Sequence, residues 1–134
     1  MSQQESTPRD GDTKAPSPEP PLDSLTPERA LSLWHGVMLH ALREAHPDLT
    51  ARQFALMIHV YLTPPPHTVR GLAAELNMSK PAVTRALDRL GAYEFLRRKR
   101  DEADKRSVLV QRTVKGSVYL REFADLAAKV AREV

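Results

Sequence analysis

Residues 75–90, ELNMSKPAVTRALDRL, end one helical pattern and start another within a few positions. Asn77 is a residue type that adopts the positive φ of a tight turn. Ser79 and Pro81 are typical of a helix start, because the serine hydroxyl accepts a bond from a free N–H and the proline lacks an N–H. Apolar residues then recur on one helical face, at Val83, Leu87 and Leu90. The segment therefore predicts two short helices joined by a tight turn.

Other start and stop signals divide the rest of the chain into helices. Thr26 with Pro27 starts the first of them, and Thr113 is placed to cap the last. Thr50 and Gln53, three residues apart, form a capping box for a second, almost wholly apolar helix, which the run TPPPH ends. We expect helices over about residues 27–45, 50–62, 69–76 and 79–90, and from 114 onward.

The pattern changes after Leu90 to two short runs of β-forming and charged residues. The runs cover Phe95–Arg100 and Arg106–Arg112, and the polar segment Asp101–Lys105 separates them. They predict a β-hairpin with a charged tip. The expected fold is therefore mostly α-helical with one small β-hairpin, in the order of a winged helix-turn-helix.

The composition excludes several classes of function. The chain has 134 residues, 41% of them hydrophobic, and no cysteine, which is typical of one small globular domain without disulfides or thiol nucleophiles. No Ser/His/Asp set, paired-carboxylate motif or glycine-rich phosphate loop stands out, so we expect no enzyme and no cofactor. The longest apolar run, residues 54–62, is shorter than the roughly 20 residues that cross a bilayer. With no apolar signal segment at the N-terminus, we expect a cytoplasmic protein without membrane contact.

The net charge of +3 is unevenly distributed. Residues 1–24 hold five of the eleven prolines, few large apolar side chains and a net charge of −3, so we expect a disordered tail there. Residues 79–106 carry nine Lys and Arg against five Asp and Glu, while residues 25–78 balance at zero. The positive charge therefore gathers on the second helix of the turn and on the hairpin, where double-stranded DNA would bind.

The second helix of a helix-turn-helix enters the major groove with its N-terminal residues at the base edges. Arg85 is the candidate for a base contact, because a guanidinium donates two parallel hydrogen bonds to guanine. Ser79, Lys80 and Thr84 are candidates for phosphate or mixed contacts. Arg89 is a candidate either for DNA or for an acidic partner within the helix. The alternative for the whole set is an ordinary solvated helix face.

The hairpin carries a second group of candidates in the run RRKR, residues 97–100. Strand alternation points Arg98 and Arg100 to one side and Arg97 and Lys99 to the other, so all four do not reach the same DNA surface. We take Arg98 and Arg100 as phosphate-binding candidates, together with Lys105 at the tip. The other pair is then solvated or braces the hairpin.

The segments VRGLAAELNMSKPAVTRALDRL and FLRRKRDEADKRSVLVQRTVKG resemble the DNA-binding half of the MarR family of bacterial transcription regulators. The most distinctive match is the wing pattern of Asp104, Arg106, Thr113 and Gly116. The resemblance implies that Arg106 enters the minor groove and that Asp104 braces the wing by pairing with an arginine, for which Arg98 is the candidate. It also implies a homodimer on a pseudo-palindromic operator, more often a repressor, with a small-molecule effector pocket.

Two positions depart from the family pattern. The family usually has glycine just before the wing strand and leucine before the conserved threonine, whereas this chain has Glu94 and Arg112. A glutamate in a left-handed C-cap conformation costs about 1 kcal/mol relative to glycine. We therefore expect a differently shaped junction at Glu94.

The resemblance also suggests how the chain is divided. Residues 25–134 form one MarR-like domain, in which residues 49–113 are the DNA-binding lobe and the helices within 25–48 and 114–134 dimerise. Independently, the first and last helices have apolar faces wider than one core requires, which favours a second subunit. The alternative is that these two helices simply cover each other.

Small ligands are a further question. Candidates for lining an aromatic effector pocket are Trp34, Met38, Phe54 and Met57. Ordinary core packing is the alternative for all four residues. The five histidines suggest a metal site, but His35 and His40 lie about 140° apart around a helix and no cysteine or clustered acid completes a ligand set, so we expect none.

A hypothesis from another class of function is a winged helix that serves as a protein-interaction module. Its basic hairpin would bind an acidic partner protein instead of DNA. The two hypotheses differ in the assembly they need, because a symmetric operator requires a dimer. Sedimentation and binding of random duplex at low salt would separate them.

Overall fold

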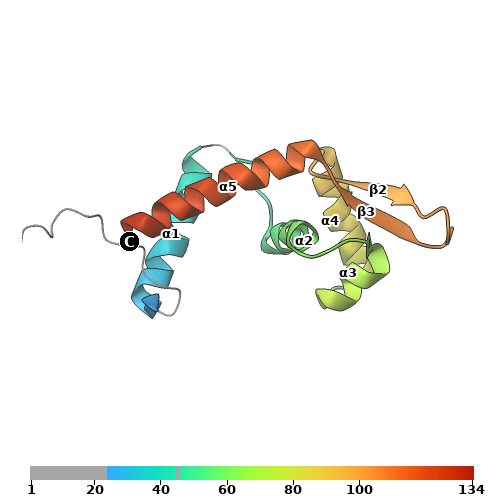
Figure 1. Cartoon of the computed structure of the whole chain (residues 1–134), viewed down its shortest axis with the longest axis horizontal. Helices are drawn as coiled ribbons and strands as arrows, with labels where there is room; N and C mark the ends of the chain where they lie inside the picture. The colour runs from blue at the N-terminus through green and yellow to red at the C-terminus, as the bar shows by residue number, and fades with distance from the viewer. Residues whose placement is uncertain (1–23, 45) are drawn as a thin grey trace, which may run out of the picture.

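The structure, a computed structural model, describes residues 24–44 and 46–134, so the expected tail lies outside the described residues apart from Ser24. The described part contains five helices and a three-stranded sheet (Figure 1). In chain order the elements are α1 (Pro27–Arg43), α2 (Ala51–Leu62), β1 (His67–Thr68), α3 (Val69–Glu75), α4 (Lys80–Ala92), β2 (Leu96–Arg100), β3 (Val108–Arg112) and α5 (Val114–Glu133). The predicted mostly α-helical winged-helix fold is confirmed.

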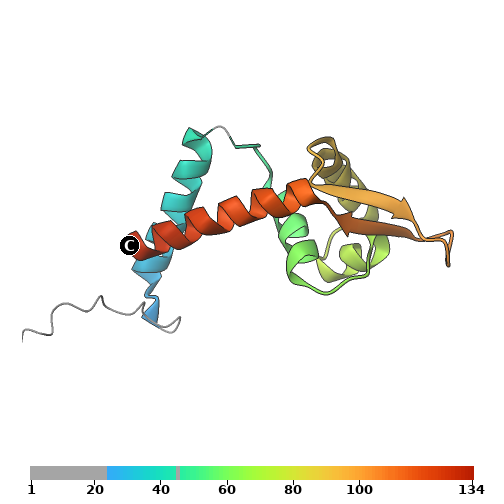
Figure 2. The ribbon, with the colours of Figure 1, turned by 45° about the horizontal axis from the view of Figure 1, so that its top comes forward.

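Two parts can be distinguished in the described chain. Helices α2, α3 and α4 pack with the sheet into a compact part, which we call the lobe. Helix α5 starts at the lobe and runs away from it to cross α1, and we call α1 and α5 the arm (Figures 1 and 2). The wing hairpin projects from the lobe on the side away from the arm.

The sheet is antiparallel, in the order β1–β3–β2. Strands β2 and β3 form the predicted hairpin, although β3 begins at Val108 and not at Arg106 as expected. Strand β1 was not predicted, because two residues carry no periodicity. It places His67 opposite Val110 and so joins the wing to the segment that follows α2.

All five helices of the described part begin at a hydroxyl side chain, which accepts a bond from an otherwise unpaired backbone N–H. The caps are Thr26, Thr50, Thr68, Ser79 and Thr113. The predicted capping box is present: Gln53 N–H donates to Thr50 Oγ1 at 3.1 Å, and Thr50 N–H donates to Gln53 Oε1 at 2.9 Å. These caps, each contributing about 1 kcal/mol, define where the helices start.

The core lies in the lobe. Helices α2 and α4 and strands β2 and β3 bury most of its apolar side chains, among them Leu56, Met57, Val60, Val83, Leu87, Leu90, Leu96 and Val110. The arm buries far less, since Val37 and Val130 are the fully buried apolar side chains among its described residues. Burial therefore fixes the lobe much more firmly than it fixes the arm.

The arm helices touch closely at one point and leave the rest of α1 uncovered. A Cβ placed on Gly36 would lie 2.6 Å from Val130 Cγ1, so the glycine permits the close crossing. Leu31 and Trp34 nevertheless remain 71% and 64% exposed, and Leu42 is similarly open. The alternative that α1 and α5 simply cover each other is therefore wrong.

The Tyr61 hydroxyl joins α2 to both ends of the wing. It donates to the carbonyl oxygen of Phe95 at 2.8 Å and accepts from Thr113 N–H at 3.0 Å. Thr113 Oγ1 in turn donates to Glu94 O at 2.7 Å and accepts from Gly116 N–H at 2.9 Å. These bonds fix the two wing strands and the first turn of α5 to the same side chain.

The expectation of a differently shaped junction at Glu94 is wrong. Glu94 has a φ of 63°, the left-handed conformation for which glycine is usually required. Its N–H donates to Gly91 O at 2.9 Å, and its carbonyl accepts the Thr113 hydroxyl bond. The bonds around the junction hold the glutamate in a conformation that its side chain disfavours.

We predict that Gly116→Ala lowers the free energy of unfolding by about 1–3 kcal/mol. The added Cβ would clash with the Tyr61 hydroxyl and with the carbonyl oxygen of Phe95. Because the carbonyl belongs to the backbone, it cannot rotate away as a side chain can. Urea denaturation followed by circular dichroism measures the effect.

Gly91→Ala is the matched control for this prediction. The nearest atom to a Cβ there, Leu96 O, is 3.9 Å away, and the residue lies within α4. Replacing this helical glycine is expected to raise the free energy of unfolding by about 0.5–1 kcal/mol. Equal stability of the two variants would contradict the packing described for Gly116.

Candidate nucleic-acid interface

The turn between α3 and α4 has the predicted geometry. Asn77 has a φ of 53°, a conformation that asparagine reaches more easily than most residues. Met78 N–H donates to Ala73 O at 3.0 Å and closes the turn. Ser79 Oγ then accepts from Ala82 N–H at 3.2 Å, which starts α4. The break and restart in the sequence is therefore a helix-turn-helix.

Helix α4 is divided into a buried and an exposed face. Val83, Leu87 and Leu90 are at most 1% exposed and fix how the helix is rotated in the lobe. The exposed residues include Ser79, Lys80, Thr84, Arg85 and Arg89, together with the acidic Asp88. Lys80 and Arg85 form no ion pair and no side-chain hydrogen bond with any other described residue. Their charges are thus available to a ligand.

Two arginines have partners other than those expected. Arg89 Nη2 donates to the Tyr93 hydroxyl at 3.1 Å, and its guanidinium lies over the Tyr93 ring, so its partner in the helix is not an acid. Arg98 Nη2 lies 2.6 Å from Asp88 Oδ1, not beside Asp104 as we expected. The ion pair joins the first wing strand to α4.

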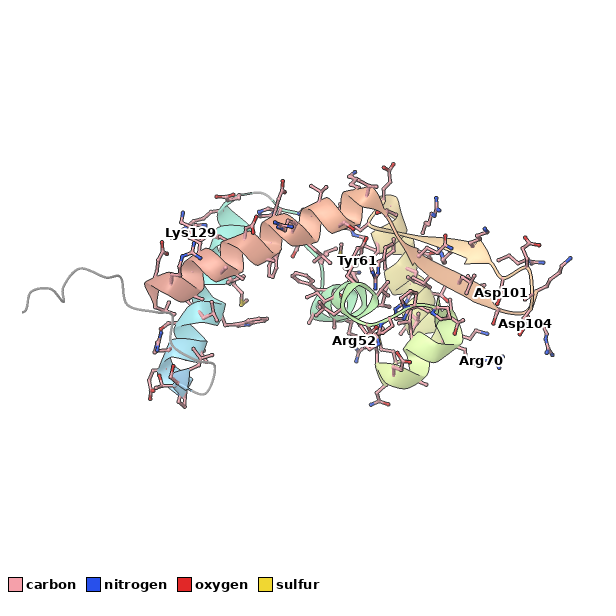
Figure 3. All side chains as sticks on the ribbon, viewed as in Figure 1. Arg52, Tyr61, Arg70, Asp101, Asp104 and Lys129 are labelled. Carbon is pink, nitrogen blue, oxygen red and sulfur yellow. The ribbon has the colours of Figure 1, made fainter. Side chains whose placement is uncertain are left out.

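Asp104 instead stabilises the wing tip locally. Its Oδ1 accepts from Arg106 N–H at 3.1 Å and lies 3.7 Å from Arg106 Nε. Asp101 Oδ1 accepts from Ala103 N–H at 3.0 Å, and Asp101 N–H donates to Ser107 O at 3.1 Å. Both aspartates lie at the tip (Figure 3), and the Arg106 side chain remains 93% exposed.

The remaining wing cations are exposed. All four residues of the run RRKR are exposed, and Arg97 Nε donates across the hairpin to Gln111 Oε1 at 3.2 Å. Arg100 and Lys105 have no ion pair or side-chain hydrogen bond with any described residue. The wing therefore presents its charge mostly to solvent, with Arg97 and Arg98 the two that brace it.

Arg112 has a structural role that we did not predict. Its Nε donates to Val60 O at 3.0 Å and its Nη2 to Thr63 O at 2.8 Å, so it satisfies carbonyl groups at the end of α2. The partners are about 50 residues away in the sequence, and no local pattern indicates them. The sequence also gives no signal for the exposed Arg52 and Arg70, because the zero net charge of residues 25–78 conceals them.

The candidate effector residues do not form a pocket in this chain. Trp34 and Met38 are 64% and 52% exposed on α1, whereas Met57 is fully buried in the lobe. Phe54 packs edge-on against Phe123, with ring centroids 4.7 Å apart. The four residues therefore do not line a common pocket. The alternative, ordinary core packing, applies to Met57 and in part to Phe54, but not to Trp34 or Met38.

Aromatic rings continue from Phe54 toward the wing root. Phe95 stacks on Tyr119 with centroids 4.5 Å apart, and Tyr93 stacks on Phe95 at 5.4 Å. Burial, with a smaller contribution from Tyr93, raises the pKa of the Tyr119 hydroxyl above its ordinary value. Tyr119 therefore stays neutral over the physiological range and acts as a packing residue between arm and lobe.

Four of the histidines form two separate pairs: the rings of His59 and His67 pack edge-on with centroids 6.0 Å apart, and His40 and His46 both lie near Glu44. His59 Nε2 lies 2.6 Å from Glu75 Oε1, and His67 Nε2 lies 3.2 Å from Thr63 O. Within residues 24–44 and 46–134, no group of three or more His, Asp or Glu is arranged to hold a metal ion. None of the helices in these ranges has the length and apolar character needed to cross a membrane.

Residues 49–108 match the model of the MarR family. A comparison with curated proteins finds no match. Several solved structures are similar in fold. Wild-type MarR from E. coli in its apo form has a TM-score of 0.63 at 24% identity, covering 87% of this chain and 83% of that one.

Two further structures have the same fold over slightly less of the chain. A variant of E. coli MarR complexed with operator DNA has a TM-score of 0.59 at 24% identity, covering 79% of this chain and 70% of that chain. A transcriptional regulator from Thermotoga maritima has a TM-score of 0.59 at 24% identity, covering 79% of this chain and 69% of that chain. The likeness extends over both lobe and arm.

We predict a measurable coupling between Asp88 and Arg98 and none between Asp104 and Arg98. The side chains of Arg98 and Asp88 are 36% and 62% exposed, so water screens their pair and a coupling of about 0.2–1 kcal/mol is expected. Double-mutant cycles with Asp88→Asn, Asp104→Asn and Arg98→Gln, measured by urea denaturation, test this. A larger coupling for the Asp104 cycle would contradict the observed pairing.

Proposed function

We propose that the chain, whose residues 49–108 match the model of the MarR family, is a transcription regulator of that family and binds double-stranded DNA as a homodimer. The observation that carries this proposal is the cationic surface of α4 and the wing. Residues 49–113 carry twelve Lys and Arg against six Asp and Glu. A large share of these cations is exposed and unpaired, and a regular polyanion is the ligand that such a surface fits.

Helix α4 is the proposed recognition helix and lies in the major groove. Arg85, exposed and unpaired near its N-terminal end, contacts a guanine edge through two parallel hydrogen bonds. Ser79, Lys80 and Thr84 contact phosphates or base edges beside it. Arg89 is hydrogen-bonded to Tyr93, so it attracts the DNA through its positive charge and makes no specific contact with a base.

The wing lies along the adjacent minor groove in the same proposal. Arg106, whose side chain is 93% exposed, enters the groove, while Asp104 holds the tip that carries it. Arg100 and Lys105 bind flanking phosphates. Arg98 is paired with Asp88, so its contribution is mainly to orient the wing against α4.

The exposed face of α1 supports a second copy of the chain as partner. Leu31, Trp34, Met38 and Leu42 recur at spacings of three and four residues, so they lie along one side of the helix. Exposed apolar stripes of this kind are covered in stable proteins. A two-fold dimer through the arm would place two recognition helices on half-sites about 10 bp apart in a pseudo-palindromic operator.

Such a dimer excludes other proteins from the DNA that it covers, and we therefore propose a repressor. Its site of action is the DNA of the cell, which in a bacterium lies in the cytoplasm. Neither step requires catalytic chemistry from the protein. The dispersed placement of Trp34, Met38, Phe54 and Met57 gives no support to the effector pocket that we expected from them.

Selection of bound duplexes from a random pool is the experiment that tests this function. A two-fold-symmetric consensus together with a dimer in sedimentation is the expected result. A strict monomer that retains no duplex at low salt would favour the protein-interaction module instead. Because phosphate contacts release condensed counterions, affinity for the selected duplex should also fall steeply with salt.

We predict that Arg85→Ala relaxes base preference at one position of each half-site and costs about 1–3 kcal/mol on the preferred base. Arg106→Ala should weaken binding while leaving the preference at that position intact. Binding of a set of single-base operator variants separates the two effects. Uniform weakening by Arg85→Ala across all sequences would make Arg85 a phosphate contact.

A further inference from the structure

Two exposed arginines of the lobe lie outside both the recognition helix and the wing. Arg52 is the second residue of α2, and Arg70 is the second residue of α3. Figure 3 shows Arg52 on the side of the lobe toward the arm and Arg70 on the side toward the wing. Nothing in the proposed function assigns them a role.

Neither guanidinium has a partner within the described residues. No ion pair or side-chain hydrogen bond involves Arg52 or Arg70 there. Only two acids lie between residues 46 and 78: Glu75 is bound to His59 at 2.6 Å, and Asp48 forms no ion pair with Arg52, four residues further on. Although the charges of this segment sum to zero, Arg52 and Arg70 are therefore two cations that no nearby acid neutralises.

Arg52 lies close to the proposed base-reading residue. It lines, together with Arg85, a hollow of about 150 Å³ between the start of α2 and the first half of α4. The other lining residues, which include Gln53, Met78 and Ala82, are uncharged. An anion at this hollow would meet two guanidinium groups from different helices and no carboxylate.

Arg70 lies on α3, the first helix of the helix-turn-helix, on the side of the lobe toward the wing (Figure 3). Helix α3 packs against α4 and also against strands β1 and β3, so it contacts both the recognition helix and a strand of the wing. The same helix carries Thr68 as its cap and Val69 as a buried residue, which fixes its first turn in the lobe. Arg70 thus lies on the helix that contacts both DNA-binding elements.

We propose that Arg52 and Arg70 bind phosphates of the two DNA strands that border the major groove, one on each side of α4. A helix in a groove about 12 Å wide has a backbone on both sides, and a guanidinium binds a phosphate through two hydrogen bonds. Such contacts set the depth and register of the helix but read no sequence. The inference rests on the proposed function and adds the positioning residues for it.

The test measures how affinity for the selected duplex depends on salt, for wild type, Arg52→Gln, Arg70→Gln and the double variant. Each phosphate that the protein no longer binds should reduce the slope of log K against log salt by about 0.9. In the dimer a single variant loses two such contacts and the double variant four, so the slope falls by about 1.8 and about 3.6 respectively. Each single variant should weaken operator and random duplex by the same factor, because no base contact is removed. Arg52→Lys, which keeps the charge, should retain the slope.

Lys129→Gln is the matched control. Lys129 is an exposed, unpaired cation on α5, at the far end of the molecule from the wing (Figure 3) and beside the arm crossing at Val130. Its replacement should leave the slope unchanged, and sedimentation should show the same dimer as wild type. Thermal unfolding of each variant, monitored by circular dichroism, should coincide with wild type. A lowered slope in a variant that folds as wild type then shows that the replaced arginine binds a phosphate.

The outcomes separate this inference from the function beneath it. If wild type binds no duplex, the proposed function fails. If wild type binds but both glutamine variants keep its affinity and slope, only the phosphate contacts are refuted. A change of preference at a single base in Arg52→Gln would likewise overturn the assignment, since Arg52 would then read sequence.

Discussion

A single hydroxyl group, that of Tyr61, fixes the position of the wing and of the arm relative to the lobe. It bonds to Phe95 before the first wing strand and to Thr113 after the second, and Thr113 starts α5. Moving Tyr61 would therefore move the hairpin and the long helix together. Gly116 allows this arrangement, because α5 passes so close to Tyr61 and Phe95 that no side chain fits. Helix α5 and the wing are consequently joined to each other and to the end of α2 through Tyr61.

The same junction explains how a glutamate replaces the glycine expected before the wing. The left-handed conformation of Glu94 costs about 1 kcal/mol relative to glycine. Hydrogen bonds from Glu94 N–H to Gly91 O and from Thr113 Oγ1 to Glu94 O, each contributing about 1 kcal/mol, offset that cost. The hydrogen bonds of the Glu94 backbone thus determine its conformation, although a residue with a side chain prefers a negative φ.

Local signals in the sequence were sufficient for the helices, the turn and the hairpin. Caps such as Ser79 and the Thr50–Gln53 box act within three residues, so neighbouring residues alone determine where helices begin. The partners of side chains are a different matter. Arg98 meets Asp88 on another element, and Arg112 meets carbonyls about 50 residues away, which no periodicity encodes. Strand β1 is too short to leave a pattern. The net charge of residues 25–78 fails to reveal exposed cations for a similar reason. It counts Glu75 as a negative charge, although Glu75 is paired with His59 and does not neutralise Arg52 or Arg70.

The open face of α1 follows from the geometry of the arm. Helices α1 and α5 approach closely at Gly36 and Val130, and a crossing of two rods cannot bury residues such as Leu31 and Leu42 that lie away from that point. Val130 lies about 25 Å along α5 from Thr113, at 1.5 Å per residue. In the proposed dimer, two arms of this length meet near the crossing and hold the two lobes on opposite sides of the two-fold axis.

The angle between the two arms must then place the recognition helices roughly 34 Å apart, which is the distance between successive major grooves on one face of DNA. Because α5 is tied to the wing through Tyr61, any change in that angle would also reorient the wing, so arm geometry and DNA fit are mechanically coupled.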